Sequence, residues 1–461
     1  MLVNIIMHSS DSKKIFSELY DPHETNVVEN YDEKKLITNS QMFSELFFIG
    51  ANSFGGYSKK NDRIEKKIVN DKRFLTKKSF KMILTLSEHI PGPTSTQLII
   101  SLSAIKTTSL IGTFLGMIGY ILPGFILSLI ISSLIYYLRG YLQFNYDTSA
   151  ATPLLTISPD NYLQYYLQVI ITGMNQGSLA ILLLTGLDFS RQFSKSIYHL
   201  SIIFFSALSY YFFNSFPLML LIMLLCGLFS LFNRDQDYII GIEDFTVELD
   251  GIPFLGTQCL IVYLLVYILL LLLILYFDIY SINFYLMERF FRMGSIVIGG
   301  GASVFPFIIA EFSLVGLISE LDVLSGFSIV SLLPGPVFNI ACIIGTLING
   351  PIAGFLCTFV VFLPGALFIL WSLPFVNSFT QMYSIQRFLC GINCALIGFI
   401  FTACFKMWII SCFYNPFTNW IIGSLNFLLA AILIAVFKII EPFALIIASV
   451  LHLCVKILLK I

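Results

Sequence analysis

Charged residues are scarce in this chain. Asp, Glu, Lys and Arg make up 11% of its 461 residues, and the net charge is only −1. Soluble domains usually contain about 25% charged residues. This scarcity excludes a soluble domain of the whole length, and with it nucleic acid as a main partner.

Signatures of common enzymes are also absent. The sequence has no His-Glu-x-x-His zinc motif, no Gly-x-x-x-x-Gly-Lys-Ser/Thr phosphate loop and no large polar domain. We therefore expect no catalysis, no cofactor, no bound metal and no ATP-driven pumping by this chain alone. The nine cysteines all lie at or after Cys226. Cys390 and Cys394 share a helical face, and we expect packing there, with metal or redox chemistry as the alternative.

Long apolar segments are what the sequence does contain. The chain is 57% hydrophobic and its mean hydropathy is +0.87. A helix needs about 20 apolar residues to cross about 30 Å of hydrocarbon. The segments of about that length are Ser109–Leu138, Gln168–Leu187, Phe216–Phe232 and Cys259–Phe277. They predict an all-α, multi-pass integral membrane protein, whether of the plasma membrane or an internal one.

Two Pro-Gly-Pro motifs interrupt the apolar sequence, at Pro91–Pro93 and Pro334–Pro336. Proline removes a backbone donor and clashes with the preceding helical turn. Each motif therefore predicts a broken helix, whose exposed polar backbone is tolerated in a membrane only beside protein or a solute site.

The second half of the chain repeats the first. Each half has a Gly-Gly pair before its Pro-Gly-Pro, and a Leu-Pro-Gly and a Gly-x-Asn after it. The matched segments are Gly50 with Gly294, Gly55–Gly56 with Gly299–Gly300, Leu122–Gly124 with Leu363–Gly365, and Gly173–Asn175 with Gly391–Asn393. Ordered matches at nearly constant spacing indicate a duplication, which is the usual build of secondary transporters.

Four regions follow from this repeat. We predict an aqueous tail over residues 1–41, a first repeat over 42–232, a linker with one extra membrane helix over 233–283, and a second repeat over 284–461. The apolar run Leu2–Met7 is too short for a cleaved signal.

Charge suggests how the repeats are oriented. Residues 59–81 contain ten Lys or Arg and three acids, whereas residues 302–325 contain three acids and no Lys or Arg. The positive-inside rule then predicts an inverted repeat. Ile64, Ile68 and Leu75 share one face of the basic segment, which either lies on anionic lipid or forms a solvated loop.

These motifs together resemble the chromate ion transporter family. The resemblance covers nearly the whole chain from about residue 42, and its clearest segments are Ser53–Gly56, Pro91–Gln97, Gly299–Pro306 and Leu333–Ala341. It implies a multi-span carrier in a lipid bilayer for chromate or a similar inorganic oxyanion such as sulfate. The family pattern has proline where this chain has Tyr57, and glutamine where it has Glu88 and Ser331.

The residues at each break also suit an anion when considered without the family. A helix can restart at Thr94–Gln97 and at Val337–Asn339, with its first free N–H groups and its positive end at the break. The Gly-Gly pairs allow close approach of either a solute or another helix. The predicted substrate-binding residues are Gly55, Gly56, Pro91, Gly92, Pro93, Thr94, Ser95, Gln97, Gly299, Gly300, Pro334, Gly335, Pro336 and Asn339.

Ionisable residues inside apolar segments cost roughly 3 kcal/mol each at a helix centre and therefore tend to be functional. Glu88 and His89 border the first break and are candidates to carry a coupled proton. Arg292 is a candidate to offset the charge of an anion. Glu45 and Glu311 are further candidates, with a water-accessible interface as the alternative.

Three functions remain open at this point. The first is a secondary carrier for an oxyanion that works by alternating access, with or without coupling to protons. The second is an anion channel built on the same broken helices, and the third is a membrane scaffold or sensor that transports nothing. One chain holds both halves, so either a monomer or a homodimer would serve.

Overall fold

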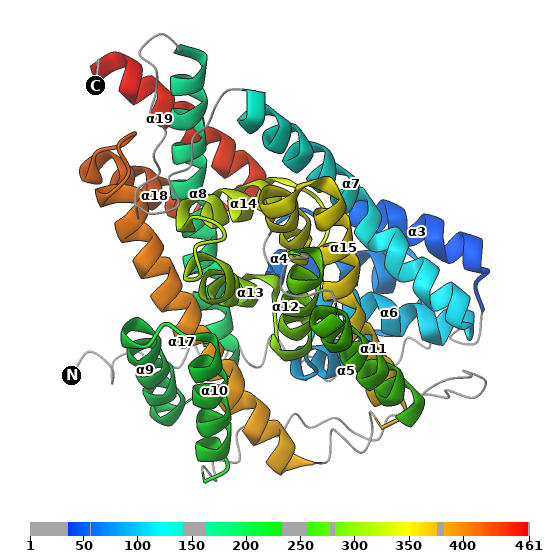
Figure 1. The fold of residues 1–461 in the computed structure, drawn as a ribbon. Helices are drawn as coiled ribbons and strands as arrows, with labels where there is room; N and C mark the ends of the chain where they lie inside the picture. The colour runs from blue at the N-terminus through cyan, green and yellow to red at the C-terminus, as the bar shows by residue number, and fades with distance from the viewer. Residues whose placement is uncertain are drawn as a thin grey trace, which may run out of the picture.

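The computed structural model describes residues 36–55, 57–141, 162–194, 196–232, 256–276, 282–375 and 382–459. Within these ranges every regular element is helical (Figure 1). Six spans in the same ranges are long and apolar enough to cross a membrane: Leu110–Leu138, Tyr165–Phe193, Thr257–Tyr276, Val337–Phe375, Tyr383–Phe413 and Glu441–Leu458. The predicted all-α, multi-pass membrane fold is confirmed.

The first half runs from α3 to α10. Its elements are α3 (Asn39–Ala51), α4 (Tyr57–Glu65), the π-helical turn η1 (Lys66–Asp71), α5 (Lys77–His89), α6 (Thr94–Thr107), α7 (Leu110–Tyr141), α8 (Tyr162–Phe193), α9 (Ile197–Phe212) and α10 (Phe216–Ser230). Helix α11 (Thr257–Tyr276) then separates this half from the second. It corresponds to the extra membrane helix predicted in the linker.

The second half has elements in the same order. They are α12 (Ile282–Ile296), η3 (Gly301–Ser303), α13 (Val304–Ile308), the π-helical turn η4 (Ile309–Ser313), α14 (Glu320–Leu332), η5 (Val337–Asn339), α15 (Ile340–Ser372), η6 (Leu373–Phe375), α17 (Tyr383–Phe413), α18 (Trp420–Ala435) and α19 (Glu441–Leu459). Helix α15 corresponds to both α6 and α7. It bends at Gly350, where φ is +84°, at the place that Thr108 occupies between α6 and α7 with φ of +46°.

The two halves pack by the same contacts. Helix α3 lies along α7, and α12 lies along α15. A Cβ at Gly50 would lie 2.3 Å from the carbonyl oxygen of Tyr120, and one at Gly294 would lie 2.2 Å from that of Val361. Glycine is therefore required at both crossings, because any side chain would collide with backbone.

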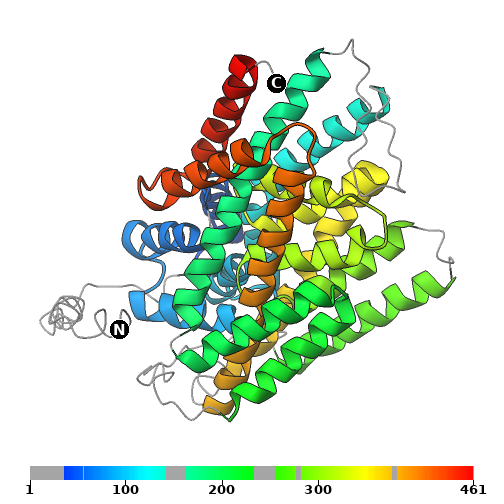
Figure 2. The same ribbon diagram turned by 90° about the vertical axis from the view of Figure 1, so that its left-hand side faces the viewer.

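The halves also exchange their last helices (Figures 1 and 2). Helices α9 and α10 of the first half pack on α17 of the second, while α18 and α19 of the second pack on α8 of the first. Gly391 allows the approach of α10, where an added Cβ would lie 2.4 Å from the carbonyl oxygen of Cys226. Gly173 does the same for α19, with Ser449 Cα at 2.8 Å. Each half thus completes the packing of the other.

Both Pro-Gly-Pro segments interrupt the helical backbone. Helix α5 ends at His89 and α6 begins at Thr94, while α14 ends at Leu332 and helix resumes at Val337 in η5. Between them the chain turns at the central glycine, with φ of +130° at Gly92 and +89° at Gly335. Residues with a Cβ rarely adopt such a conformation.

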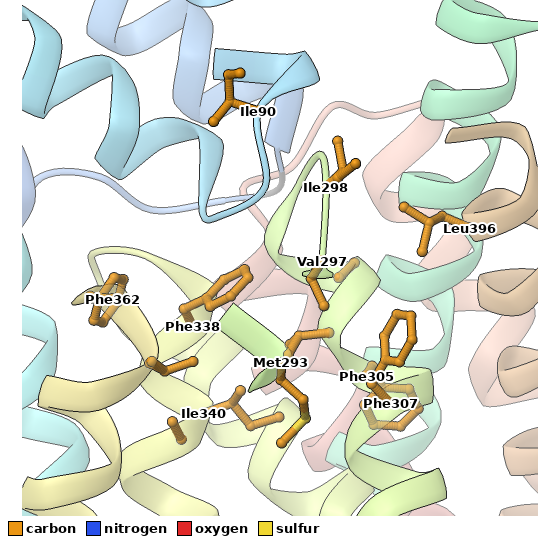
Figure 3. Packing of buried hydrophobic residues seen from close by; sticks show 14 of the residues in the cluster. Ile90, Met293, Val297, Ile298, Phe305, Phe307, Phe338, Ile340, Phe362 and Leu396 are labelled. Atoms are coloured by element: carbon orange, nitrogen blue, oxygen red, sulfur yellow. The ribbon is translucent and has the colours of Figure 1, made fainter. Parts of the chain in front are cut away.

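Reciprocal hydrogen bonds tie each break to the other half. The N–H of Gly92 donates to the carbonyl of Val297 over 2.7 Å, and the N–H of Gly335 donates to that of Ser53 over 3.0 Å. Ser53 and Val297 hold matching places, three residues after Gly50 and Gly294. Figure 3 shows the apolar side chains that pack around this region, with Ile90 beside the first break and Phe338 just after the second. Each break is thereby held against the other half of the chain.

The basic segment after Gly55 does not lie on lipid through its apolar face. Ile64, Ile68 and Leu75 are 1%, 0% and 4% exposed, because they pack into the hydrophobic core. Helix α11 shows the opposite pattern, with only Cys259 and Leu270 buried, as expected for a helix that faces lipid.

The predicted region boundaries can be compared with the structure only in part. Residues 1–35, 233–255 and 277–281 lie outside the described residues. The tail over residues 1–41 and the linker over 233–283 therefore stay predictions. Helix α3 begins at Asn39, shortly before the predicted start of the first repeat.

Candidate functional site

Motif residues from both halves line one cavity between the two helix breaks. The cavity offers about 40 Å³ to the centre of a water molecule, whereas a single water needs about 10–15 Å³. It therefore has room for more than one small polar group. The motif residues that line it are Gly55, Pro93, Thr94, Ser95, Gly300 and Pro336.

The start of α6 contributes backbone donors to this cavity. The carbonyl of Pro93 accepts hydrogen bonds from the N–H groups of Thr96 and Gln97, at 2.9 and 3.0 Å. The N–H groups of Thr94 and Ser95 thus precede the first bonds within the helix. The second break ends similarly, since the carbonyl of Pro336 accepts from the N–H of Asn339 at 3.1 Å.

Side chains near the breaks reach across to the other half. The hydroxyl of Thr94 donates to the carbonyl of Gly299 over 2.6 Å. Gln97 donates through Nε2 to the carbonyl of Pro91 at 2.7 Å and to that of Gly365 at 3.2 Å. Gln97 therefore helps hold the break rather than lining the cavity.

Asn339 and Pro334 lie at the second break and pack against Gly124, outside the cavity lining. A Cβ at Gly124 would lie 2.1 Å from the carbonyl oxygen of Pro334 and 2.7 Å from Nδ2 of Asn339. Asn339 is fully buried, and neither its Oδ1 nor its Nδ2 has a hydrogen-bond partner among the described residues. Because a buried amide without partners is costly, it marks a position where a water or polar solute would be stabilising.

Two ionisable residues that the sequence did not single out line the cavity. Lys60 of α4 is 5% exposed, and its Nζ donates to the carbonyl of Gly335 over 2.6 Å. Glu441, at the start of α19, is 6% exposed. Burial lowers the pKa of Lys60 to about 8, with the negative charge of Glu441 opposing this shift and the positive charge of Arg63 adding to it.

The remaining lining residues come from α4, α8, η3, α14 and η5 and are mainly small or apolar. Asn61, Thr185 and Ser331 supply polar groups, and Ile181, Gly301, Ala302, Phe327, Val337 and Phe338 supply the rest. A positively charged residue, hydroxyl groups and free helix N–H groups around a small cavity form an arrangement that can bind an anion.

The predicted charge candidates lie away from the cavity lining. Glu88 and His89 are 9% and 8% exposed at the end of α5, where Nδ1 of His89 lies 2.7 Å from the carbonyl oxygen of Thr85. Glu45 forms an ion pair of 2.6 Å with Lys72 at the edge of the protein. Gly56 lies outside the described residues.

Arg292 and Glu311 belong to a separate network of charges. Arg292 pairs with Glu311 at 3.1 Å and with Glu288 at 3.2 Å, and Arg289 pairs with Glu311 at 3.3 Å. The guanidinium of Arg292 also lies over the ring of Phe216, at 4.5 Å. The charge of Arg292 is therefore balanced by carboxylates of the protein, and the side chain does not line the cavity.

The cysteines line neither the cavity nor a cluster of metal ligands. Eight of the nine are buried and Cys454 is exposed. Within the described ranges no group of three or more His, Cys, Asp or Glu side chains is arranged to hold a metal ion.

A multi-pass helical protein in which two broken helices from matched halves meet at a polar cavity is of the membrane-transporter class. Comparison with known proteins gives the family. A family model described as chromate transporter matches residues 40–231 and 284–454 of this chain. The chain belongs to the chromate transporter family, and its two matched regions correspond to the two halves of the structure.

Individual relatives agree with this assignment. An uncharacterized transporter of Methanocaldococcus jannaschii is 21% identical over 385 residues, which cover 83% of this chain and 87% of the relative. A chromate transport protein of Pseudomonas aeruginosa is 27% identical over 92 residues, 20% of this chain and 22% of the relative. No solved structure shows a significant match.

Proposed function

We propose that this protein is a secondary transporter of a small inorganic oxyanion of the chromate or sulfate type, and that the cavity between the two breaks is its binding site. The observation that carries the proposal is the convergence of Gly55, Thr94, Gly300 and Pro336 on one cavity, although these residues lie far apart in the sequence. Family membership and the name of the Pseudomonas aeruginosa relative support an oxyanion as the solute.

The chemistry of the cavity fits such a solute. A tetrahedral oxyanion presents acceptor oxygens in several directions and needs donors on more than one side. The leading N–H groups of α6, the hydroxyl group of Ser95 and the ammonium group of Lys60 are donors of this kind. These donors come from the first half, whereas Gly300 and Pro336 of the second half line the same cavity, so binding depends on how the halves are placed relative to each other.

Alternating access is the mode of transport that this arrangement favours. In an inverted repeat, movement of one half against the other opens the shared site to one side of the membrane and then to the other. The reciprocal bonds of Gly92 and Gly335 support a two-fold relation between the halves. The basic segment in one half and the acidic one in the other support opposite orientations in the membrane.

Proton coupling completes the proposal. A divalent anion meets a large electrostatic barrier in a membrane, and a co-transported proton reduces the net charge that crosses. The cavity contains ionisable groups that are able to take part in this coupling.

Uptake into proteoliposomes tests the proposed function. The purified chain should accumulate radiolabelled sulfate or chromate under an inward proton gradient and should show counterflow. Substituting Thr94 and Ser95 by alanine should reduce uptake, whereas Ser201→Ala, on the exposed side of α9, should not. Absence of flux for all tetrahedral oxyanions tried would sink the proposal, and large unitary currents without counterflow would favour a channel.

A further inference from the structure

Lys60 and Glu441 bring opposite charges to the cavity from the two halves of the chain. Lys60 lies on α4, just after the first Gly-Gly pair, and Glu441 begins the last helix, α19. Both side chains are almost fully buried and both line the cavity. Neither residue belongs to a glycine or proline motif.

Lys60 is held where an anion would bind. Its Nζ donates to the carbonyl of Gly335, the central residue of the second break. An ammonium group has three N–H donors, and this bond uses one of them. Lys60 therefore places its positive charge in the cavity and, through the same group, bonds the backbone of the second break.

Glu441 provides the counter-charge when no anion is present. Its place in the first turn of α19 favours the ionised carboxylate, because the positive end of a helix stabilises a negative charge. An oxyanion in the same small cavity would be repelled by this carboxylate.

We propose that Glu441 is the counter-ion of Lys60 in the empty site, and that a bound oxyanion replaces it while the carboxylate of Glu441 takes up one proton from solution. The proton bonds to a carboxylate oxygen as the anion enters and leaves it when the anion departs. One proton would therefore accompany each anion. This inference rests on the proposed function and names the residues that perform its coupling.

Other charged groups near this pair are either exposed or directed elsewhere. Arg63, on α4, donates to the carbonyl of Phe54 over 2.8 Å. On α8, which packs on α19, Asp188 forms an exposed pair with Arg191. The other groups on the same and adjacent elements include Asp62 and Glu65 on α4, Lys106 in the last turn of α6, Lys438, exposed before α19, Glu320 and Asp322 at the far end of α14, and His452 and Lys456 several turns along α19.

The proposal predicts two steps in the dependence of anion binding on pH. At the lower step, where Glu441 exchanges its proton, affinity should fall by up to about tenfold per pH unit as the pH rises, the limit for one linked proton. A second fall should occur near pH 8, because the pKa of Lys60 is about 8 and its charge is present only below that value.

Binding to the purified full-length chain in detergent separates the two groups. Sulfate, which stays a dianion over this range, is titrated from pH 5 to 9 by calorimetry, with proton uptake followed in weak buffer. Glu441→Gln should abolish the lower step and keep the one near pH 8. Lys60→Arg should keep the lower step and remove the upper one, since arginine stays charged. Lys60→Met should weaken binding at least about tenfold, and Asp188→Asn, an exposed carboxylate outside the cavity, should match the wild type.

The wild-type protein alone can overturn the proposal even where a variant does not fold. Uptake of about one proton per sulfate, lost in Glu441→Gln, supports the proposal. No proton uptake by the wild type, or equal uptake by Glu441→Gln, overturns it. If sulfate binds with proton uptake but no flux occurs in liposomes, the proposed transport is refuted, while the proposed protonation of Glu441 on anion binding is supported. If no oxyanion binds, both are refuted.

Discussion

The two halves of the molecule are built alike around their helix breaks but carry different side chains there. Thr94 and Ser95 follow the first Pro-Gly-Pro, whereas Val337 and Phe338 follow the second. Lys60 lies five residues after Gly55, and the residue at the same distance after Gly299 is Val304. Duplication has therefore preserved the frame of the site, while most of the polar groups that suit an anion lie in the first half.

The ion pairs of the two halves differ in a similar way. In the first half, the Glu45–Lys72 pair joins α3 to the end of η1, with side chains 31% and 40% exposed. In the second half, α12 is joined to η4 by Arg292 and Glu311, whose side chains are 21% and 6% exposed. Corresponding elements are thus connected by a partly exposed pair in one half and by a buried network in the other.

Breaking the buried network should have the largest effect on stability. Arg292→Gln leaves Glu288 and Glu311 with only Arg289 to balance them, and the loss of one partner from a buried pair costs roughly 3–5 kcal/mol. We expect a large fall in the apparent Tm in detergent. The matched change in the first half, Lys72→Gln, should cost no more than about 1 kcal/mol.

A double substitution provides the control for this comparison. Arg292→Gln combined with Glu311→Gln removes both charges of the pair and should be less destabilising than the sum of the single changes. Additive losses, or equal losses for Arg292→Gln and Lys72→Gln, would contradict the distinction between the two halves.

The helix crossings should respond equally in both halves. Gly50→Ala and Gly294→Ala each place a methyl group against a backbone carbonyl, and overpacking of this kind costs roughly 1–3 kcal/mol. Gly326→Ala is the control, since the nearest atom to its Cβ is the flexible end of Ile344 at 3.1 Å. Thermal unfolding monitored by size-exclusion chromatography measures all three, and a large difference between the first two would break the symmetry.

A smaller effect should distinguish the two helix restarts. Thr94→Val removes the hydroxyl that bonds the carbonyl of Gly299, a loss of about 1 kcal/mol. We expect a lower Tm and a higher KM for oxyanion uptake. Val337→Thr, at the matching place, removes no hydrogen bond and should change both less than Thr94→Val does. A larger effect of the second change would refute the assignment of the polar side of the site to the first half.

The glycine and proline pattern of the sequence predicted the helix breaks and the matched positions in the two halves. Gly92 and Gly335 adopt positive φ angles at the breaks, and Gly50 and Gly294 lie at close helix crossings. These roles depend on local backbone geometry, which a short motif encodes.

The charged residues of the cavity were beyond such prediction. Lys60 lies in the segment 59–81, which contains ten Lys or Arg residues, and nothing in the sequence shows that this one is buried. Glu441 lies in the last helix, and only the exchange of helices between the halves brings it to the breaks. The sequence also made Arg292 look available to offset the charge of an anion. Its partner Glu311 lies 19 residues further on, and only the folded structure brings the two side chains together.

The location of a bound oxyanion tests the central claim most directly. Selenate has the charge and shape of sulfate, and its selenium gives an anomalous diffraction signal that marks its position in a crystal. The account predicts one selenium peak in the cavity, beside the N–H groups of Thr94 and Ser95 and near Nζ of Lys60. A peak at Arg289 and Arg292 with the cavity empty would contradict it.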